Sequence, residues 1–153
     1  MADRRAEAVA ALARKLGHDF RDPSLLEQAL THASVGEGAE HDARGRPFLD
    51  NQRMEFLGDR VLGLLVADRL MRNFPKANEG EMSSMLHALV DKAACARAAE
   101  ALGVGDAMRL SPGEAKQGGR RREGVLGDAM EAILAAAGLD GGMDAARAVF
   151  ERA

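Results

Sequence analysis

The residue types of this chain favour helices along its whole length and provide little material for a β-sheet. The chain contains no tryptophan or tyrosine and few β-branched residues. Alanine, leucine, methionine, arginine and glutamate, all good helix formers, are abundant. No run shows the alternation of apolar and polar residues that a half-buried strand requires. The sequence therefore predicts an all-α fold.

Capping residues and helix breakers indicate where the helices begin and end. Asp22 and Asn78 are candidate N-caps, Pro23 suits the first position of a helix, and glycine or proline follows most of the apolar stretches. The expected helices cover about 3–16, 22–30, 51–73, 79–101, a short one from 111, 123–137 and 142 to the end. Residues 35–50 are rich in glycine and charge, and we expect them to form an exposed loop insertion.

Length and composition indicate one globular domain over residues 1–153. Hydrophobic residues make up 46% of the chain and charged residues 29%, which suits a packed core. Cys95 is the single cysteine, so no internal disulfide is possible, and we expect it to be a small buried side chain. No signal peptide and no apolar run long enough to span a membrane is present, which favours the cytoplasm. With a formal charge of −3, the chain would have to meet a nucleic acid through a local basic patch or through metal ions.

Two carboxylates lie one turn apart on the helix expected at 51–73. Glu55 and Asp59 have i, i+4 spacing, which places them as neighbours on one face. At 4 Å and an effective dielectric constant of 20, two like charges repel by about 4 kcal/mol. The next positions on this face, Leu62, Gly63 and Val66, are apolar or small, so the face is expected to be partly buried. A bound cation would relieve both the repulsion and the cost of burial.

A second acidic pair occurs on the helix expected at 123–137. Asp128 and Glu131 have i, i+3 spacing and lie among small residues that allow another helix to approach closely. If the two helices pack together, four carboxylates meet, and such all-oxygen ligands suit Mg²⁺ or Mn²⁺. Gly58 lies between the first pair, where a close backbone or ligand approach would explain a glycine inside a helix. For either pair alone, a solvent-exposed helix face is the alternative.

Other residues carry weaker signals. Phe56 is either an aromatic contact for a second subunit or an ordinary core residue. A basic cluster before the Asp128 helix could contact phosphates near the acidic site or form a solvated turn. This cluster comprises Lys116, Arg120, Arg121 and Arg122. The sequence lacks a P-loop, an EF-hand loop, a zinc-type cluster and a nucleophile elbow, and its four histidines are scattered.

The segment Asn-Gln-Arg-Met-Glu-Phe-Leu-Gly-Asp-Arg-Val-Leu at 51–62 resembles the signature helix of ribonuclease III. The resemblance continues, in order, through the residues at 30–34, 74–83, 113–119 and 127–132, and so it covers nearly the whole chain. It implies the all-α ribonuclease III endonuclease-type helical domain, which works as a two-fold homodimer.

The resemblance also implies an activity and a set of site residues. The activity is Mg²⁺-dependent endonucleolytic cleavage of double-stranded RNA by metal-activated water, in RNA processing and maturation, with Mn²⁺ able to substitute. The expected ends are 5′-phosphates and 3′-hydroxyls with short 3′ overhangs. Residues matching the family's catalytic and metal-binding carboxylates are Glu55, Asp59, Asp128 and Glu131. Glu79 matches a further acidic position and Phe56 a dimer-interface aromatic.

Two departures from the family pattern leave alternatives open. Gln52 stands where many members have a glutamate, and an amide is a weaker ligand that cannot act as a base. The C-terminal double-stranded-RNA-binding domain common in the family is absent from this chain. A non-catalytic RNA-binding or assembly dimer of the same fold is therefore one alternative. A helical metal-dependent hydrolase of free nucleotides is another, which the full signature disfavours.

Overall fold

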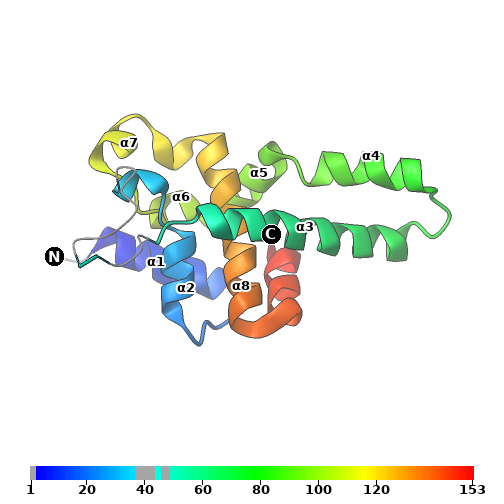
Figure 1. Ribbon diagram of the computed structural model, residues 1–153, viewed down its shortest axis with the longest axis horizontal. Helices are drawn as coiled ribbons and strands as arrows, with labels where there is room; N and C mark the ends of the chain where they lie inside the picture. Colours follow the sequence, from blue (N-terminus) through cyan, green and yellow to red (C-terminus); the bar gives the residue numbers. More distant parts are fainter. Residues whose placement is uncertain (1–2, 37–43, 46–48) are drawn as a thin grey trace.

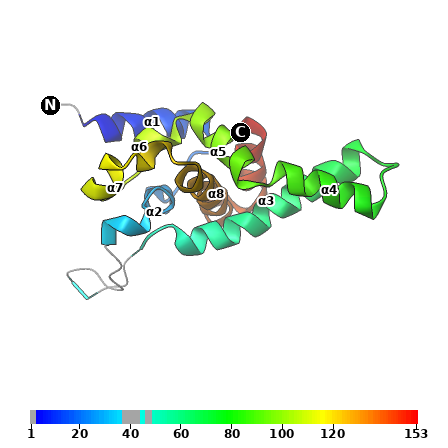
Figure 2. The ribbon, with the colours of Figure 1, turned by 90° about the horizontal axis from the view of Figure 1, so that it is seen from above.

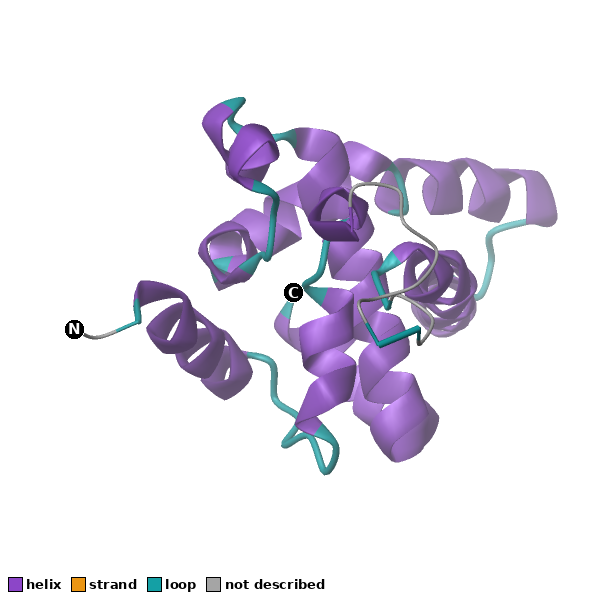
Figure 3. Ribbon diagram, turned by 60° about the vertical axis from the view of Figure 1, so that its left-hand side comes forward, coloured by secondary structure: helices purple, strands orange, loops and turns teal. Residues whose placement is uncertain are grey.

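The computed structural model describes residues 3–36, 44–45 and 49–153, and it confirms the all-α prediction for them (Figure 3). No strand occurs in these ranges, where Thr31 and Arg109 form an isolated parallel bridge. The helices are α1 (Arg4–Lys15), α2 (Pro23–Ala29), η1 (Ala33–Gly36), α3 (Gln52–Asn73), α4 (Glu79–Leu89), α5 (Lys92–Leu102), α6 (Val104–Ala107), α7 (Pro112–Lys116), η2 (Gly119–Arg121) and α8 (Glu123–Arg152).

Helix α8 lies at the centre of the fold, with α2, α3, α5 and α6 packed against it (Figures 1 and 2). Every residue from Val125 to Ala137 except Asp128 is buried, as expected for a helix that its neighbours cover on most sides. Residues 129–137 of this helix are all buried, and most of them are alanine. Small side chains let the neighbouring helix axes come close, so this stretch sets the spacing of the core. Cys95 is buried beside it, as expected, and burial raises the pKa of its thiol to about 11.

Helix α4 and the C-terminal half of α3 form a hairpin that extends away from the other helices (Figures 1 and 2). No residue of α4 is buried, and large apolar side chains such as Met71, Phe74 and Leu89 are exposed on the hairpin. The start of α4 is fixed by the expected capping box, in which Asn78 accepts from the Glu81 amide and the Glu81 side chain accepts from the Asn78 amide. The acidic residues in the first turn of α4, Glu79 and Glu81, are therefore exposed on the hairpin.

Two of the expected helix boundaries are wrong. The helix expected over 79–101 is broken at Val90 and Asp91, because the Asp91 side chain accepts from the Ala94 amide at 2.7 Å and starts α5 as a separate helix. The chain also continues helically through Gly138 and turns at Gly142, whose φ of +78° lies in the left-handed region that favours glycine. The first break redirects α5 onto α8, and the second folds the end of α8 back on itself.

The expected loop insertion at 35–50 lies largely outside the described residues. Val35 and Gly36 belong to η1, and Leu49 is exposed. Within the described part of the chain, no helix is both long enough and apolar enough to cross a membrane.

Candidate metal centre

Helices α3 and α8 cross in direct backbone contact at Gly58. A Cβ atom at this position would lie 1.7 Å from the carbonyl oxygen of Glu131, far closer than any real contact. The prediction that Gly58 permits a close approach is therefore confirmed, and the approaching group is the backbone of α8. The crossing places the acidic residues of the two helices at the same level.

The start of α3 is held by the buried residue Asn51. Its Nδ2 donates to the carbonyl oxygen of Ala29 at 3.1 Å, and its backbone amide donates to the carbonyl oxygen of Thr31 at 2.9 Å. These bonds attach the first turn of α3 to the end of α2. Because Glu55 lies in that first turn, they also fix the position of its carboxylate.

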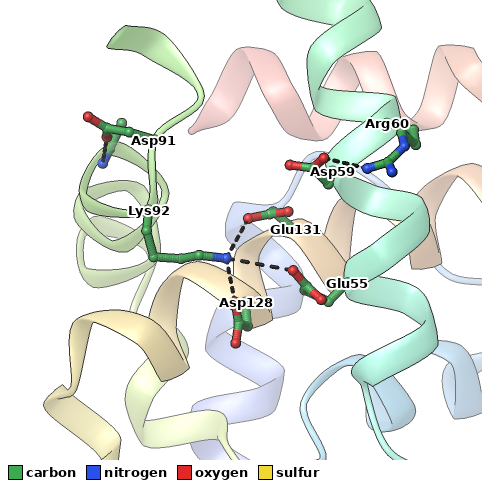
Figure 4. Close-up of polar contacts among 8 residues, drawn as sticks. Glu55, Asp59, Arg60, Asp91, Lys92, Asp128 and Glu131 are labelled. Carbon is green, nitrogen blue, oxygen red and sulfur yellow. Dashed lines mark hydrogen bonds and ion pairs between the residues drawn. The ribbon is translucent and has the colours of Figure 1, made fainter. Parts of the chain in front are cut away.

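Three of the four candidate carboxylates meet at this crossing (Figure 4). Glu55 comes from α3, and Asp128 and Glu131 come from α8; one oxygen of each lies within 4.8 Å of the others. The side chain of Glu131 is only 3% exposed, whereas those of Glu55 and Asp128 are 34% and 46% exposed. The cluster thus has a buried end at Glu131 and an end open to solvent.

Lys92, the first residue of α5, points its ammonium group into the middle of these carboxylates (Figure 4). Its Nζ donates to Asp128 Oδ1 in a short hydrogen bond and to Glu131 Oε1 at 2.9 Å, and it lies 3.7 Å from Glu55 Oε1. Sequence reasoning missed this residue. Placed in the interior of one long helix, Lys92 has the pattern of an ordinary surface lysine, and only Asp91 as an N-cap could have indicated its special position.

Gly127 on α8 provides the space through which the Lys92 side chain passes. A Cβ at Gly127 would lie 2.4 Å from Lys92 Cδ and 2.9 Å from its Cγ. The residue before Asp128 must therefore be a glycine if the ammonium group is to reach the cluster in this way. This contact explains why a glycine occurs at position 127, inside α8 and directly before Asp128.

Burial and neighbouring charged groups shift the pKa values of Lys92 and Glu131. Burial lowers the pKa of Lys92, but its hydrogen bonds with Asp128 and Glu131 outweigh that effect and leave the pKa raised. Burial raises the pKa of Glu131 to about 7; Lys92 counteracts this in part, and the charges of Asp59 and Glu55 add to it. The carboxylates together carry more negative charge than one ammonium group offsets.

The donor set fits a divalent cation. Glu131 Oε2 is buried and has no hydrogen-bond partner among the described residues, although a buried carboxylate oxygen normally has one. All three potential ligands are carboxylates, which hard cations such as Mg²⁺ and Mn²⁺ prefer. Glu55, Asp128 and Glu131 are thus the residues that could hold such an ion.

Asp59 lies one turn further along α3 and is not part of the three-carboxylate group. Its Oδ2 accepts a hydrogen bond from Arg60 Nη1 at 2.7 Å, and its side chain is 45% exposed. Its charge still acts on the cluster, because it helps to raise the pKa of Glu131. A role for Asp59 as a direct ligand stays a prediction.

The remaining candidate residues lie outside the acidic cluster. Glu79 is the exposed first residue of α4 on the hairpin, and its accessory role stays a prediction. Lys116 and Arg121 are exposed, and Arg121 pairs with Asp106 at 3.4 Å. Arg120 has a structural role, because its Nη1 donates to the carbonyl oxygens at 105 and 108, at 3.1 and 2.7 Å.

Phe56 is 62% exposed in this chain, so the interpretation of it as an ordinary core residue is wrong. The guanidinium group of Arg60 lies 4.6 Å from the centre of its ring, in a cation–π contact. Phe56 also lines a groove with four apolar neighbours, Leu25, Met54, Leu57 and Leu139. A large aromatic side chain at the edge of such a groove is typical of a contact surface.

The fold and the site define a helical domain with a carboxylate metal centre at the crossing of two helices. A family model described as ribonuclease-III-like matches residues 22–153. The chain belongs to this family.

Curated relatives and solved structures agree with this assignment. Ribonuclease 3 of Caulobacter vibrioides is 51% identical over 148 residues, which are 97% of this chain and 62% of that protein. Ribonuclease 3 of Phenylobacterium zucineum is 54% identical over 95% of this chain and 59% of its own length. The nuclease domain of ribonuclease III from Campylobacter jejuni superposes with a TM-score of 0.84 at 35% identity, covering 94% of both chains. The chain thus spans about 60% of the length of these curated relatives.

Proposed function

We propose that this chain is the catalytic domain of a Mg²⁺-dependent endonuclease that cleaves double-stranded RNA. The observation that carries the proposal is the meeting of Glu55, Asp128 and Glu131, in which Glu131 Oε2 is buried and finds no hydrogen-bond partner among the residues described. The curated relatives are named Ribonuclease 3, which supports an RNA substrate. Cleavage would leave 5′-phosphates and 3′-hydroxyls with short 3′ overhangs, in RNA processing in the cytoplasm.

In this proposal, the residues of the chain bind the divalent ion and orient the RNA substrate. Burial fixes the Glu131 carboxylate at the base of the site, while the exposed sides of Glu55 and Asp128 face the solvent from which a phosphodiester would approach. A bound divalent ion supplies positive charge that stabilises the phosphate oxygens and lowers the pKa of water. Lys116 and Arg121 are exposed cations that can contact phosphates of the duplex.

We also propose that two copies of the domain form a two-fold homodimer through the groove beside Phe56. Phe56, Leu57 and Leu139 are 62%, 38% and 57% exposed, an apolar surface that a second copy would cover. The Campylobacter jejuni nuclease domain is described as flexible in a region involved in dimer formation, which supports a dimer of this fold. With one site per subunit, such a dimer could cut both strands of one duplex.

The proposal is tested by incubating the purified chain with a long RNA duplex, with and without Mg²⁺, and mapping the ends. We expect cleavage only with Mg²⁺, with single-stranded RNA and duplex DNA left intact. Glu131→Gln should abolish cleavage and preserve the helical circular dichroism spectrum, because it removes a buried ligand without changing its volume. Binding of duplex RNA without cleavage in Mg²⁺ or Mn²⁺ would instead indicate the non-catalytic dimer.

A further inference from the structure

We propose that Lys92 is the resident counter-ion of the carboxylate cluster and that a divalent cation must displace its ammonium group in order to bind. This inference rests on the proposed metal site and adds a residue that competes for it. Lys92 would hold the cluster together when no metal is bound, and at the same time it would weaken metal binding.

The position of Lys92 Nζ carries the argument. This nitrogen lies near one oxygen of each of the three carboxylates. It donates hydrogen bonds to Asp128 Oδ1 and to Glu131 Oε1, the latter at 2.9 Å. A Mg²⁺ ion binds oxygen at about 2.0–2.1 Å. Glu55, Asp128 and Glu131 would hold a divalent ion through oxygens that lie within 4.8 Å of one another, and the Lys92 ammonium group already contacts these oxygens. Two cations cannot share this site, because their charges repel and their volumes overlap.

The ammonium group neutralises only part of the charge of the cluster and makes only some of its hydrogen bonds. Three carboxylates face a single positive charge, and Glu55 Oε1 lies 3.7 Å from Nζ, beyond hydrogen-bonding distance. Even with Lys92 in place, Glu131 Oε2 is buried and has no hydrogen-bond partner in the part of the chain that the structure describes. A dication brings twice the charge and more coordination positions, so it has an electrostatic advantage over the lysine that it replaces.

The surroundings of Lys92 permit both positions of its side chain. Gly127 leaves room for the stem, since a Cβ there would lie 2.4 Å from Lys92 Cδ. The Lys92 side chain is 38% exposed, so it can move toward solvent without crossing the core. Asp91, which caps α5, holds the backbone of this turn in place while the side chain moves.

The first test is Mn²⁺ binding measured by isothermal titration calorimetry on the full chain. Lys92→Gln should bind Mn²⁺ about tenfold more tightly than the wild type, a typical size for coupling between two binding events. The matched control is Lys76→Gln, which removes the same charge from the exposed connection between α3 and α4 and should leave the affinity unchanged. Lys92→Arg keeps the charge and should bind no more tightly than the wild type.

Thermal unfolding of the same proteins separates the two roles of Lys92. In EDTA, Lys92→Gln should have a lower Tm than the wild type, because the buried carboxylate at 131 loses its partner. Saturating Mn²⁺ should then raise the Tm of Lys92→Gln by more than it raises that of the wild type. An equal rise in both proteins would contradict the competition.

A second test uses the unmodified protein, so it does not depend on whether a variant folds. Brief acetylation followed by mass spectrometry reports how accessible each lysine is. Lys92 should react faster when Mg²⁺ is added, because its ammonium group has left the cluster, whereas the rate at Lys76 should not change. A Lys92 rate that is unaffected by saturating Mg²⁺ would overturn the inference.

The outcomes distinguish this inference from the proposed function. Mn²⁺ binding to the wild type with equal or weaker binding to Lys92→Gln would overturn the role of Lys92 and leave the metal site standing. Absence of Mn²⁺ binding to both proteins would overturn both proposals. Tighter binding to Lys92→Gln, with Lys76→Gln unchanged, would support both.

Discussion

The contact between Gly58 and the backbone of α8 makes Gly58→Ala a severe test of the fold. The new Cβ would lie 1.7 Å from the carbonyl oxygen of Glu131 and 2.4 Å from its carbonyl carbon. Ordinary van der Waals contact begins at 3.4 Å, so the two helices must separate locally by the difference, 1.7 Å. The atoms in conflict belong to two helix backbones, and rotation of a side chain cannot relieve the clash.

The size of the effect follows from two opposing terms. Replacing glycine by alanine inside a helix gains roughly 0.5–1 kcal/mol in the free energy of unfolding. Overpacking a core costs typically 1–3 kcal/mol, and a backbone clash belongs at the upper end of that range or above it. The separation also opens gaps around buried side chains of α3 such as Met54 and Leu62, which lose part of their dispersion contacts. We therefore expect a net loss of about 3 kcal/mol.

Urea unfolding followed by circular dichroism at 222 nm measures this loss. The matched control is Gly63→Ala on the same helix, where a Cβ would meet no atom of the described residues within 4 Å. We expect this control to be stabilised by roughly 0.5 kcal/mol. If Gly58→Ala and Gly63→Ala were equally stable, the helix crossing would not be as close as the structure has it, and the reasoning would be refuted.

Three further substitutions test other parts of the molecule. Phe56→Ala should shift sedimentation from dimer toward monomer, because it removes the exposed aromatic beside the apolar groove; an unchanged dimer would remove Phe56 from the interface. Asn51→Ala should lower the free energy of unfolding in urea by about 1–2 kcal/mol, because the buried hydrogen bond to Ala29 is lost. Asp140→Asn tests pH dependence, since hydrogen bonds from the Arg21 and Asp22 amides and from His18 hold the pKa of Asp140 below its usual value. A lowered pKa contributes stability above the unfolded value of about 3.9, so the advantage of the wild type over Asp140→Asn should be full at pH 6 and shrink below about pH 4.

Helix geometry made much of the site predictable from the sequence. The spacing of Asp128 and Glu131 places both on one face of any α-helix, so no tertiary information was needed to pair them. Gly58, unfavourable inside a helix, correctly indicated a close approach. The meeting of Glu55 with the α8 pair was conditional on helix packing, and the structure provides that packing. Asp59 shows the limit of this reasoning, because sharing a helix face did not bring it into the same group.

The break before α5 and the role of Lys92 depend on contacts that sequence patterns do not report. The apolar stripe expected across 79–101 gives no reason to interrupt the helix, and Asp91 by itself is an ordinary polar residue. Its side chain becomes an N-cap because α5 turns to pack on α8, a segment more than thirty residues away along the chain. The same turn brings Lys92 over Gly127, so both features were missed for one physical reason.

Gly58 and Gly127 link the stability of the fold to the chemistry of the site. Each lies where a helix crosses a neighbour within reach of the acidic cluster, and each weakens its own helix relative to alanine. The first lets the backbone of α8 approach α3, and the second lets the Lys92 side chain reach the carboxylates. A larger residue at either glycine must therefore displace at least one member of the cluster. Such a substitution should change both the metal affinity and the free energy of unfolding. Substitutions of exposed residues on α4, where no residue is buried, should change neither quantity.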